Sequence, residues 1–176
     1  MPNRPAHLAL GTGAGALAAG ASVAFRYKRR PEAPRRLLHD IAQVGGGALA
    51  GRYAGALPDI IEPAIHPNHR GFGHSAVVGG GVASLSFVER LREWEDGCRD
   101  RAEGFRGRRL EECHAFQQSN GGDAFRHFLR AAWFFLCEMF WAALAGVPVG
   151  AAAGYVSHIV ADATTPKGVP MVGLRF

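Results

Sequence analysis

Residues 131–156 read AAWFFLCEMFWAALAGVPVGAAAGYV, and Glu138 is the only formally charged side chain among them. A helix needs about 20 predominantly apolar residues to cross the hydrocarbon core of a bilayer. This stretch meets that length comfortably, and it is the longest apolar stretch in the chain. It therefore predicts a long apolar helix that can span a membrane.

Three further apolar segments come before it. Residues 8–25 are rich in Gly and Ala and are of borderline length for a membrane span. Residues 41–57 are interrupted by Gln43 and Arg52, and residues 76–88 are short enough for a buried or re-entrant helix. Together the four segments predict an all-α fold: a small, Gly/Ala-rich bundle of about four main helices, forming a single domain over residues 1–176.

Glycine is unusually frequent in these segments, with 24 in the whole chain. Glycine in a helix interior costs about 1 kcal/mol relative to alanine in soluble proteins, whereas membrane bundles use small residues to bring helix backbones together. Residues four apart lie on one helix face. Three sets of glycines have that spacing: Gly11/Gly15, Gly47/Gly51/Gly55 and Gly146/Gly150/Gly154. The spacing predicts close helix packing and favours a membrane-embedded bundle.

The basic residues concentrate in two blocks, at 26–36 and 90–130, and the net charge is +5. The second block carries nearly as many acids as bases, whereas a nucleic-acid-binding face needs an excess of positive charge. No nucleic-acid partner is therefore expected. If the four segments cross a membrane alternately, both blocks fall on the cytoplasmic side, as the positive-inside rule requires. Membrane integration is the preferred interpretation, and a soluble bundle is the alternative.

The stretch 89–130 is expected to be a polar, Arg-rich and partly helical insertion between the third and fourth apolar helices. Leu91, Trp94, Cys98 and Arg101 recur on one helical face. Residues 119–122 read SNGG, which predicts a turn before the last helix. The three cysteines are an odd number without CxxC spacing, so neither a disulfide framework nor a cysteine zinc site is indicated.

Histidine and aspartate residues cluster near the ends of the apolar segments. His7 comes at the entrance of the first, Asp59 at the exit of the second, His69 and His74 before the third, and His158 and Asp162 at the exit of the fourth. In an up-down-up-down arrangement all these positions share one end of the bundle. Divalent transition metals bind imidazole and carboxylate groups that converge from several elements. The sequence therefore predicts a divalent metal site, most simply zinc, with manganese as a second choice.

Other roles remain open for several of these residues. His158 and Asp162 are four apart, so they can share an ion or simply a hydrogen bond. Asp59 can be a ligand or a helix cap. Arg70, between two predicted ligands, would neutralise an anionic substrate group, and Glu62 is a candidate general base or a solvated loop residue. The histidines in the charged regions are expected at the surface: His39, His114 and His127.

These motifs resemble the YdjM-like family of inner-membrane-associated, metal-dependent hydrolases. The matching pieces are His7, residues 57–59 (LPD), residues 69–75 (HRGFGHS) and residues 154–170 (GYVSHIVADATTPKGVP). The resemblance implies one ligand set: His7, Asp59, His69, His74, His158 and Asp162. In motif style the family is similar to zinc-dependent phospholipases C, which cleave phosphodiesters. Residues 60–62 (IIE) depart from the second acid that many members have after the Pro-Asp pair.

The expected function is therefore that of a membrane-associated hydrolase, in which a metal-activated water attacks a phosphoester or a similar anionic substrate. Membrane lipid or a lipid-linked or small anionic molecule would be its partner. The resemblance implies an inner-membrane location, and the topology places the metal site on the outer face. The alternative is an interaction or regulatory module in which a structural metal site ties the helix ends together.

Overall fold

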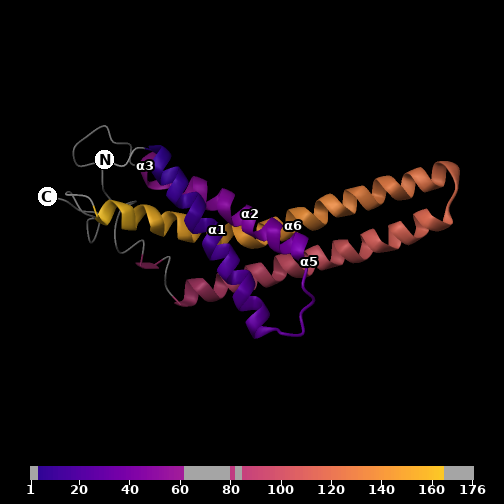
Figure 1. Cartoon of the computed structure of the whole chain (residues 1–176), viewed down its shortest axis with the longest axis horizontal. Helices are drawn as coiled ribbons and strands as arrows, with labels where there is room; N and C mark the ends of the chain where they lie inside the picture. Colours follow the sequence, from indigo (N-terminus) through magenta and orange to yellow (C-terminus); the bar gives the residue numbers. More distant parts are fainter. Residues whose placement is uncertain (1–3, 62–79, 82–84, 165–176) are drawn as a thin grey trace.

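The computed structural model describes residues 4–61, 80–81 and 85–164, and every regular element within these ranges is a helix. This confirms the predicted all-α bundle. Figure 1 shows the arrangement, in which two long helices form a hairpin and the others pack beside one half of it. The elements are α1 (Arg4–Arg29), α2 (Leu37–Ala54), α3 (Leu57–Ile61), α5 (Leu85–Gln118) and α6 (Gly121–Ala163).

The hairpin of α5 and α6 is the longest feature of the molecule, and its tip extends beyond α1 and α2 (Figure 1). Its turn lies at the predicted SNGG stretch, where Gly121 adopts the left-handed conformation with φ of 59°. Asp123 lies in the first turn of α6, where a carboxylate suits the positive end of the helix dipole. The α6 helix ends at Ala163, and Thr164 follows as its C-cap.

The stretch 89–130 differs from the partly helical insertion that was expected. Its first part lies in one continuous helix, α5, and its last part is the beginning of α6. The predicted face of α5 packs against α6: Cys98 is buried, and the Arg101 guanidinium lies 4.8 Å from the centre of the Trp141 ring. The fourth main helix is therefore the polar one, and most of the apolar segment 76–88 lies outside the described residues.

A proline in the middle of α6 creates one specific contact between the two long helices. Pro148 has no backbone N–H, so the carbonyl of Leu144, four residues earlier, loses its partner within the helix. The indole Nε1 of Trp94 on α5 donates a hydrogen bond of 3.2 Å to that carbonyl. The Trp94 side chain of α5 thus supplies the donor that Pro148 cannot provide within α6.

Helices α1, α2 and α6 meet along the glycine faces that the sequence predicted. A Cβ atom added at Gly51 of α2 would lie under 3.0 Å from the carbonyl oxygen of Gly11 on α1. One added at Gly154 of α6 would lie equally close to the Gly51 oxygen, and one at Gly150 would meet the Gly47 oxygen. We call this contact the glycine seam. It brings the three backbones closer than any larger residue would allow.

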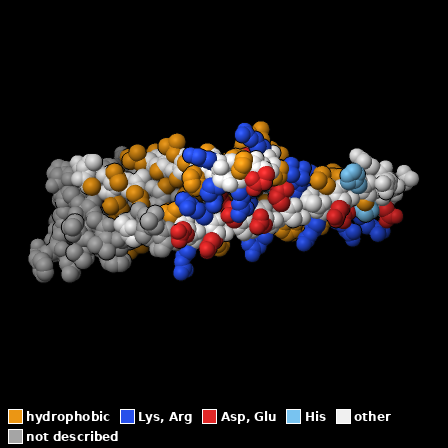
Figure 2. Space-filling view, turned by 90° about the horizontal axis from the view of Figure 1, so that it is seen from below, with side chains coloured by type: hydrophobic (Ala, Val, Ile, Leu, Met, Phe, Trp, Pro, Cys, Tyr) orange, Lys and Arg blue, Asp and Glu red, His pale blue; other side chains and the backbone are white. Residues whose placement is uncertain are grey.

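The two basic blocks lie beside each other at the far end of this three-helix unit. Arg30 and Arg36, in the loop between α1 and α2, form ion pairs of 3.0 Å with Asp96 and Glu103 of α5. Figure 2 shows charged side chains gathered over the middle and right of one face, whereas hydrophobic side chains prevail further left. The loop between α1 and α2 and the middle of α5 therefore lie next to each other.

Two helices, Pro5–Arg29 and Gly121–Ala163, are long and apolar enough to cross a membrane by length and composition. Only 17% and 28% of their apolar windows are buried within the molecule, so most of each window faces outward. Large apolar side chains are exposed on both, among them Leu10 and Leu17 on α1 and Trp133, Leu136 and Phe140 on α6.

Candidate metal centre

Three of the predicted ligands, His7, Asp59 and His158, converge at one end of the bundle. They come from α1, α3 and α6, and each offers a ligand atom within 4.8 Å of the others. Both histidines are buried, with 3% and 1% of their surface exposed, whereas the side chain of Asp59 is 29% exposed. The cluster is therefore enclosed by helices on the histidine side and reaches solvent at the carboxylate.

Local structure explains why Asp59 reaches this position. The α2 helix ends at Ala54, and the short α3 begins at Leu57 with the buried Pro58 as its second residue. Proline is well accommodated in the first turn of a helix, where its missing N–H is not needed. The new helix turns the chain, so that Asp59 approaches the end of α6 and its Oδ1 lies 3.7 Å from His158 Nε2.

Hydrogen bonding sets the orientation of the His158 ring. Its Nδ1 lies 2.7 Å from the carbonyl oxygen of Gly55, the C-cap residue of α2. A carbonyl can only accept, so Nδ1 carries the hydrogen and donates it, and the lone pair of the neutral ring lies on Nε2. This is the usual arrangement of a metal-binding histidine, because a backbone carbonyl fixes both ring and tautomer. Nε2 faces Asp59 and also lies 3.4 Å from Asp162 Oδ2.

His7 reaches the cluster because the glycine seam continues to this end of α1. A Cβ at Gly55 would lie 3.0 Å from the Cα of Gly11 and 3.1 Å from the carbonyl oxygen of His7. The beginning of α1 therefore lies directly against the end of α2. The His7 ring stacks on that of His158 with a centroid distance of 4.1 Å and an interplanar angle of 32°.

The donor set fits a divalent transition metal. Two imidazoles and one carboxylate are a common ligand set of catalytic zinc sites, which keep a fourth position for water or substrate. Ligand atoms around a tetrahedral zinc ion lie roughly 3.4 Å apart, so the present spacing needs side-chain shifts on the order of 1 Å. Asp162 is buried beside His158 and is a possible fourth ligand. This group could hold a metal ion, and its geometry does not identify which one.

The remaining predicted site residues lie outside the described residues. These are the predicted ligands His69 and His74 and the predicted catalytic residues Glu62 and Arg70. Their part in a site therefore stays a prediction.

One expectation is wrong: His39 is not a surface residue. It is 2% exposed, and its Nε2 lies 2.7 Å from Oε1 of Glu138, which is also buried. Arg109 of α5 donates to the other oxygen of Glu138 at 2.7 Å. Glu138 is the one charge in the longest apolar segment, and a charge at such a place calls for a buried partner. That signal could have directed attention to a histidine in another helix.

A second set of buried polar contacts follows along α2. Gln43 is fully buried and donates 2.9 Å to Glu95 Oε1, while Ser22 of α1 donates to Glu95 Oε2. The buried Arg99 donates 2.7 Å to Gln43 and 2.6 Å to Asp40. We call these contacts, together with the His39–Glu138–Arg109 contacts, the polar network. It joins all four long helices, and Gln43 in an apolar segment was its sequence signal.

Cys98 lies next to this network without taking part in it. It is 1% exposed. Burial raises the pKa of the Cys98 thiol, and the nearby positive charge of Arg101 opposes this only in part. The thiol is therefore protonated and shielded near neutral pH, which is typical of a structural cysteine. All three cysteines are free thiols.

Comparisons with known proteins assign no relationship: no protein-family model, curated protein or solved structure matches this chain.

Proposed function

We propose that this protein is a membrane-associated, metal-dependent hydrolase acting on a phosphoester or a similar anionic substrate. The observation that carries the proposal is the convergence of His7, Asp59 and His158 from three helices at one end of the bundle. Two buried imidazoles and a partly exposed carboxylate are suited to hold an ion firmly while leaving one side open. The resemblance to the YdjM-like family supports the same reaction class.

The roles of the residues follow from their positions. His7 and His158 would bind the ion through ring nitrogens, with the Gly55 carbonyl holding His158 in the required tautomer. Asp59 would complete the set at the solvent side. A bound divalent ion would act as a Lewis acid that polarises the substrate and activates a water. Arg70 would neutralise the anionic group and Glu62 would accept a proton, as the sequence predicts.

The location of the cluster supports a lipid or lipid-linked substrate. The metal-binding residues lie at one end of the apolar helices, and the ion pairs of Arg30 and Arg36 with α5 lie at the other. If the charged end is cytoplasmic, as the positive-inside rule favours, the cluster lies at the outer boundary of an inner membrane. A phosphoester group of a lipid is found at that depth.

Metal content of the purified protein is the first test. The full chain, prepared without chelator, should contain near-stoichiometric zinc or manganese by mass spectrometry. The double variant H158A/D162A should lose it, and the matched control H114A, at an exposed histidine on α5, should retain it. Helix content measured by circular dichroism verifies that each variant folds. Absence of metal from the wild type, even after metal addition, would rule out the proposal.

Activity is the second test, run on the same preparations. Hydrolysis of phosphodiester and phospholipid substrates should require the metal, disappear with a chelator and return when the ion is added back. A protein that binds metal stoichiometrically but hydrolyses none of these substrates would instead support a structural site.

Asp162 provides the specific observation in favour of that second function. With its Oδ2 at 3.4 Å from His158 Nε2, it could act as a fourth protein ligand and close the site. A structural zinc site is usually closed by four protein ligands, whereas a catalytic one is not. The variant D162N distinguishes the two: a closed site should lose much of its metal affinity, whereas an open site should keep its metal.

A further inference from the structure

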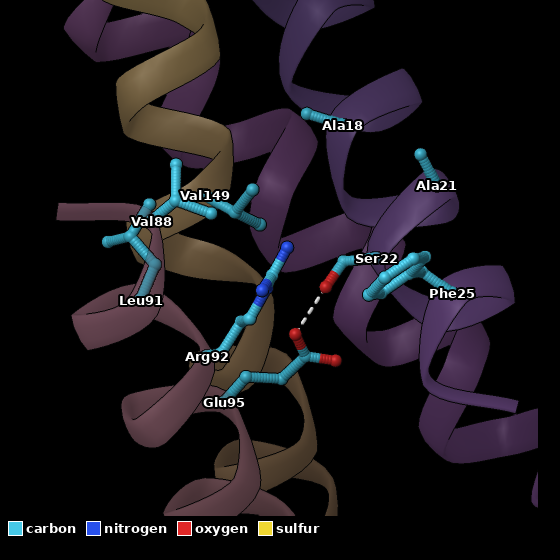
Figure 3. Close-up of a pocket in the computed structure, with 9 residues that line it drawn as sticks. All are labelled: Ala18, Ala21, Ser22, Phe25, Val88, Leu91, Arg92, Glu95 and Val149. Atoms are coloured by element: carbon cyan, nitrogen blue, oxygen red, sulfur yellow. Dashed lines mark hydrogen bonds between the residues drawn. The ribbon is translucent and has the colours of Figure 1, made fainter. Parts of the chain in front are cut away.

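A cavity of about 320 Å³ lies between α1 and α5, over α6, near the charged end of the bundle and away from the metal-binding cluster. Figure 3 shows its walls. They are mostly apolar, with Phe25 from α1, Val88 and Leu91 from α5, and Val149 from α6. Two charged side chains of α5, Arg92 and Glu95, also line it. The cavity is large enough for part of a small amphiphilic molecule.

The two charges differ in how far the protein satisfies them. Glu95 is 3% exposed, and each of its oxygens accepts a hydrogen bond, one from Ser22 and one from Gln43. Gln43 in turn accepts from the Arg99 guanidinium. Glu95 is therefore held by the polar network, and its carboxylate needs no cation from outside.

Arg92 has no such partner. Within the described part of the chain it makes no hydrogen bond or ion pair. Its guanidinium carbon lies 5.1 Å from the centre of the Phe25 ring, in a cation–π contact. Figure 3 shows the Arg92 side chain extending from α5 into the space between Val149 and Ser22. The guanidinium of Arg29 lies 5.4 Å from the same ring. Arg29 is exposed and does not line the cavity, so Arg92 is the positive charge within its walls among the described residues.

We propose that this cavity binds an anionic phospholipid, with the phosphate on Arg92 and the start of an acyl chain against Val88, Leu91 and Val149. A guanidinium binds phosphate through charge-assisted hydrogen bonds, and a cation–π contact with Phe25 leaves its N–H groups able to donate. Phe25 ends the apolar part of α1, directly before the basic stretch 26–36. In a membrane this is the depth of lipid headgroups. The proposal shares membrane association and a lipid ligand with the proposed function, but it concerns a different site.

Binding of defined short-chain lipids to the full chain in neutral detergent tests this site. Dioctanoyl phosphatidylglycerol should bind at least about tenfold more tightly than dioctanoyl phosphatidylcholine, because the choline cation of phosphatidylcholine offsets its phosphate charge and is repelled by Arg92, whereas phosphatidylglycerol keeps a net negative charge. R92Q should remove this preference. R90Q is the matched control, because Arg90 is exposed on the same helix, outside the cavity, and its replacement removes the same charge. Equal binding of the two lipids, or an equal effect of R90Q, would overturn the proposal.

A second pair of variants tests the apolar part. Ala21 lines the cavity and Ala24, on the same helix, does not. A21L should fill the space and weaken phosphatidylglycerol binding about tenfold, whereas A24L should leave it unchanged. Glycerol 1-phosphate, which has the head group chemistry without the chain, should bind far more weakly. If it binds as tightly as the lipid, the site takes free phosphate and the acyl-chain contact is wrong.

The experiment is independent of the hydrolase proposal. All titrations are carried out with a chelator present, so the metal-binding cluster contributes neither metal nor turnover. Lipid selectivity that persists in a protein without metal or hydrolytic activity would support the cavity alone. Hydrolysis without lipid selectivity would support the metal centre alone.

Discussion

The two halves of α2 are held in opposite ways. Its C-terminal half packs through glycines that have no side chain, so that Gly47 and Gly51 contact the backbones of α1 and α6 directly. Its N-terminal half packs through polar side chains, with His39, Asp40 and Gln43 bonded to α5 and α6. The glycine seam tolerates no addition of atoms, whereas the polar network tolerates no removal of a partner.

The two halves differ because they are stabilised by different interactions. Close backbone packing is stabilised by dispersion contacts. These do not depend on the release of water, so they also act on a helix surrounded by lipid. A buried ionic network is stable only when every member is bonded, because an unpaired charge in a low-dielectric interior is costly. The candidate metal centre lies at the seam end of α2, and the cavity proposed to bind lipid lies at the network end.

Removal of one charge should damage the polar network most. The variant R99M removes the donor that Asp40 and Gln43 share, and it should lower the free energy of unfolding by about 3 kcal/mol. Reversible denaturation of the full chain in detergent measures the change. R90M, which removes an exposed arginine of the same helix, should cost less than about 0.5 kcal/mol. Similar losses in both variants would mean that the network contributes no special stability.

Addition of a single methyl group should be the next largest effect. In G51A the new Cβ would lie under 3.0 Å from the carbonyl oxygen of Gly11, so the variant should lose about 2 kcal/mol of stability. The matched control is G45A, where nothing lies within 4 Å and the better helix propensity of alanine should stabilise the protein by up to about 1 kcal/mol. A loss of stability in G51A with a gain in G45A would support close packing at the seam, whereas a gain in both variants would refute it.

The Trp94 contact should have a smaller effect. W94F removes the hydrogen bond to the Leu144 carbonyl and should cost about 1 kcal/mol, measured by the same denaturation. The control is W133F, which makes the same replacement at an exposed tryptophan of α6 and should change stability by less than about 0.5 kcal/mol.

The last prediction concerns the reactivity of Cys98 and involves no change in stability. The raised pKa and burial of Cys98 should slow its alkylation by a maleimide at pH 8 by at least about tenfold relative to Cys113, which is partly exposed. Peptide mass spectrometry after timed labelling measures both rates in one sample. Equal rates would indicate that α5 separates from α6 on the timescale of the reaction.

Local periodicity made much of the fold predictable. The spacing of four between glycines describes one helix face, and these faces do meet in the structure. The position of His7, Asp59 and His158 at one end follows from the direction of successive helices, which needs no knowledge of side-chain contacts.

Long-range polar contacts were the part that local patterns could not predict. His39 and Glu138 are 99 positions apart, so the burial of one depends on a partner that no local pattern identifies. The continuous α5 was also missed, since its buried face includes Glu95 and Arg99, which a hydropathy pattern assigns to solvent.

Pro148 has a consequence for how the two longest helices align. A regular helix repeats every turn, so two smooth helices can slide by one turn and regain nearly equivalent contacts. An open carbonyl in the interior of α6 breaks that equivalence, because the Trp94 indole can satisfy it in one alignment only. A slip of about 5.4 Å would leave the carbonyl unbonded. The proline thus fixes the register of α5 along α6.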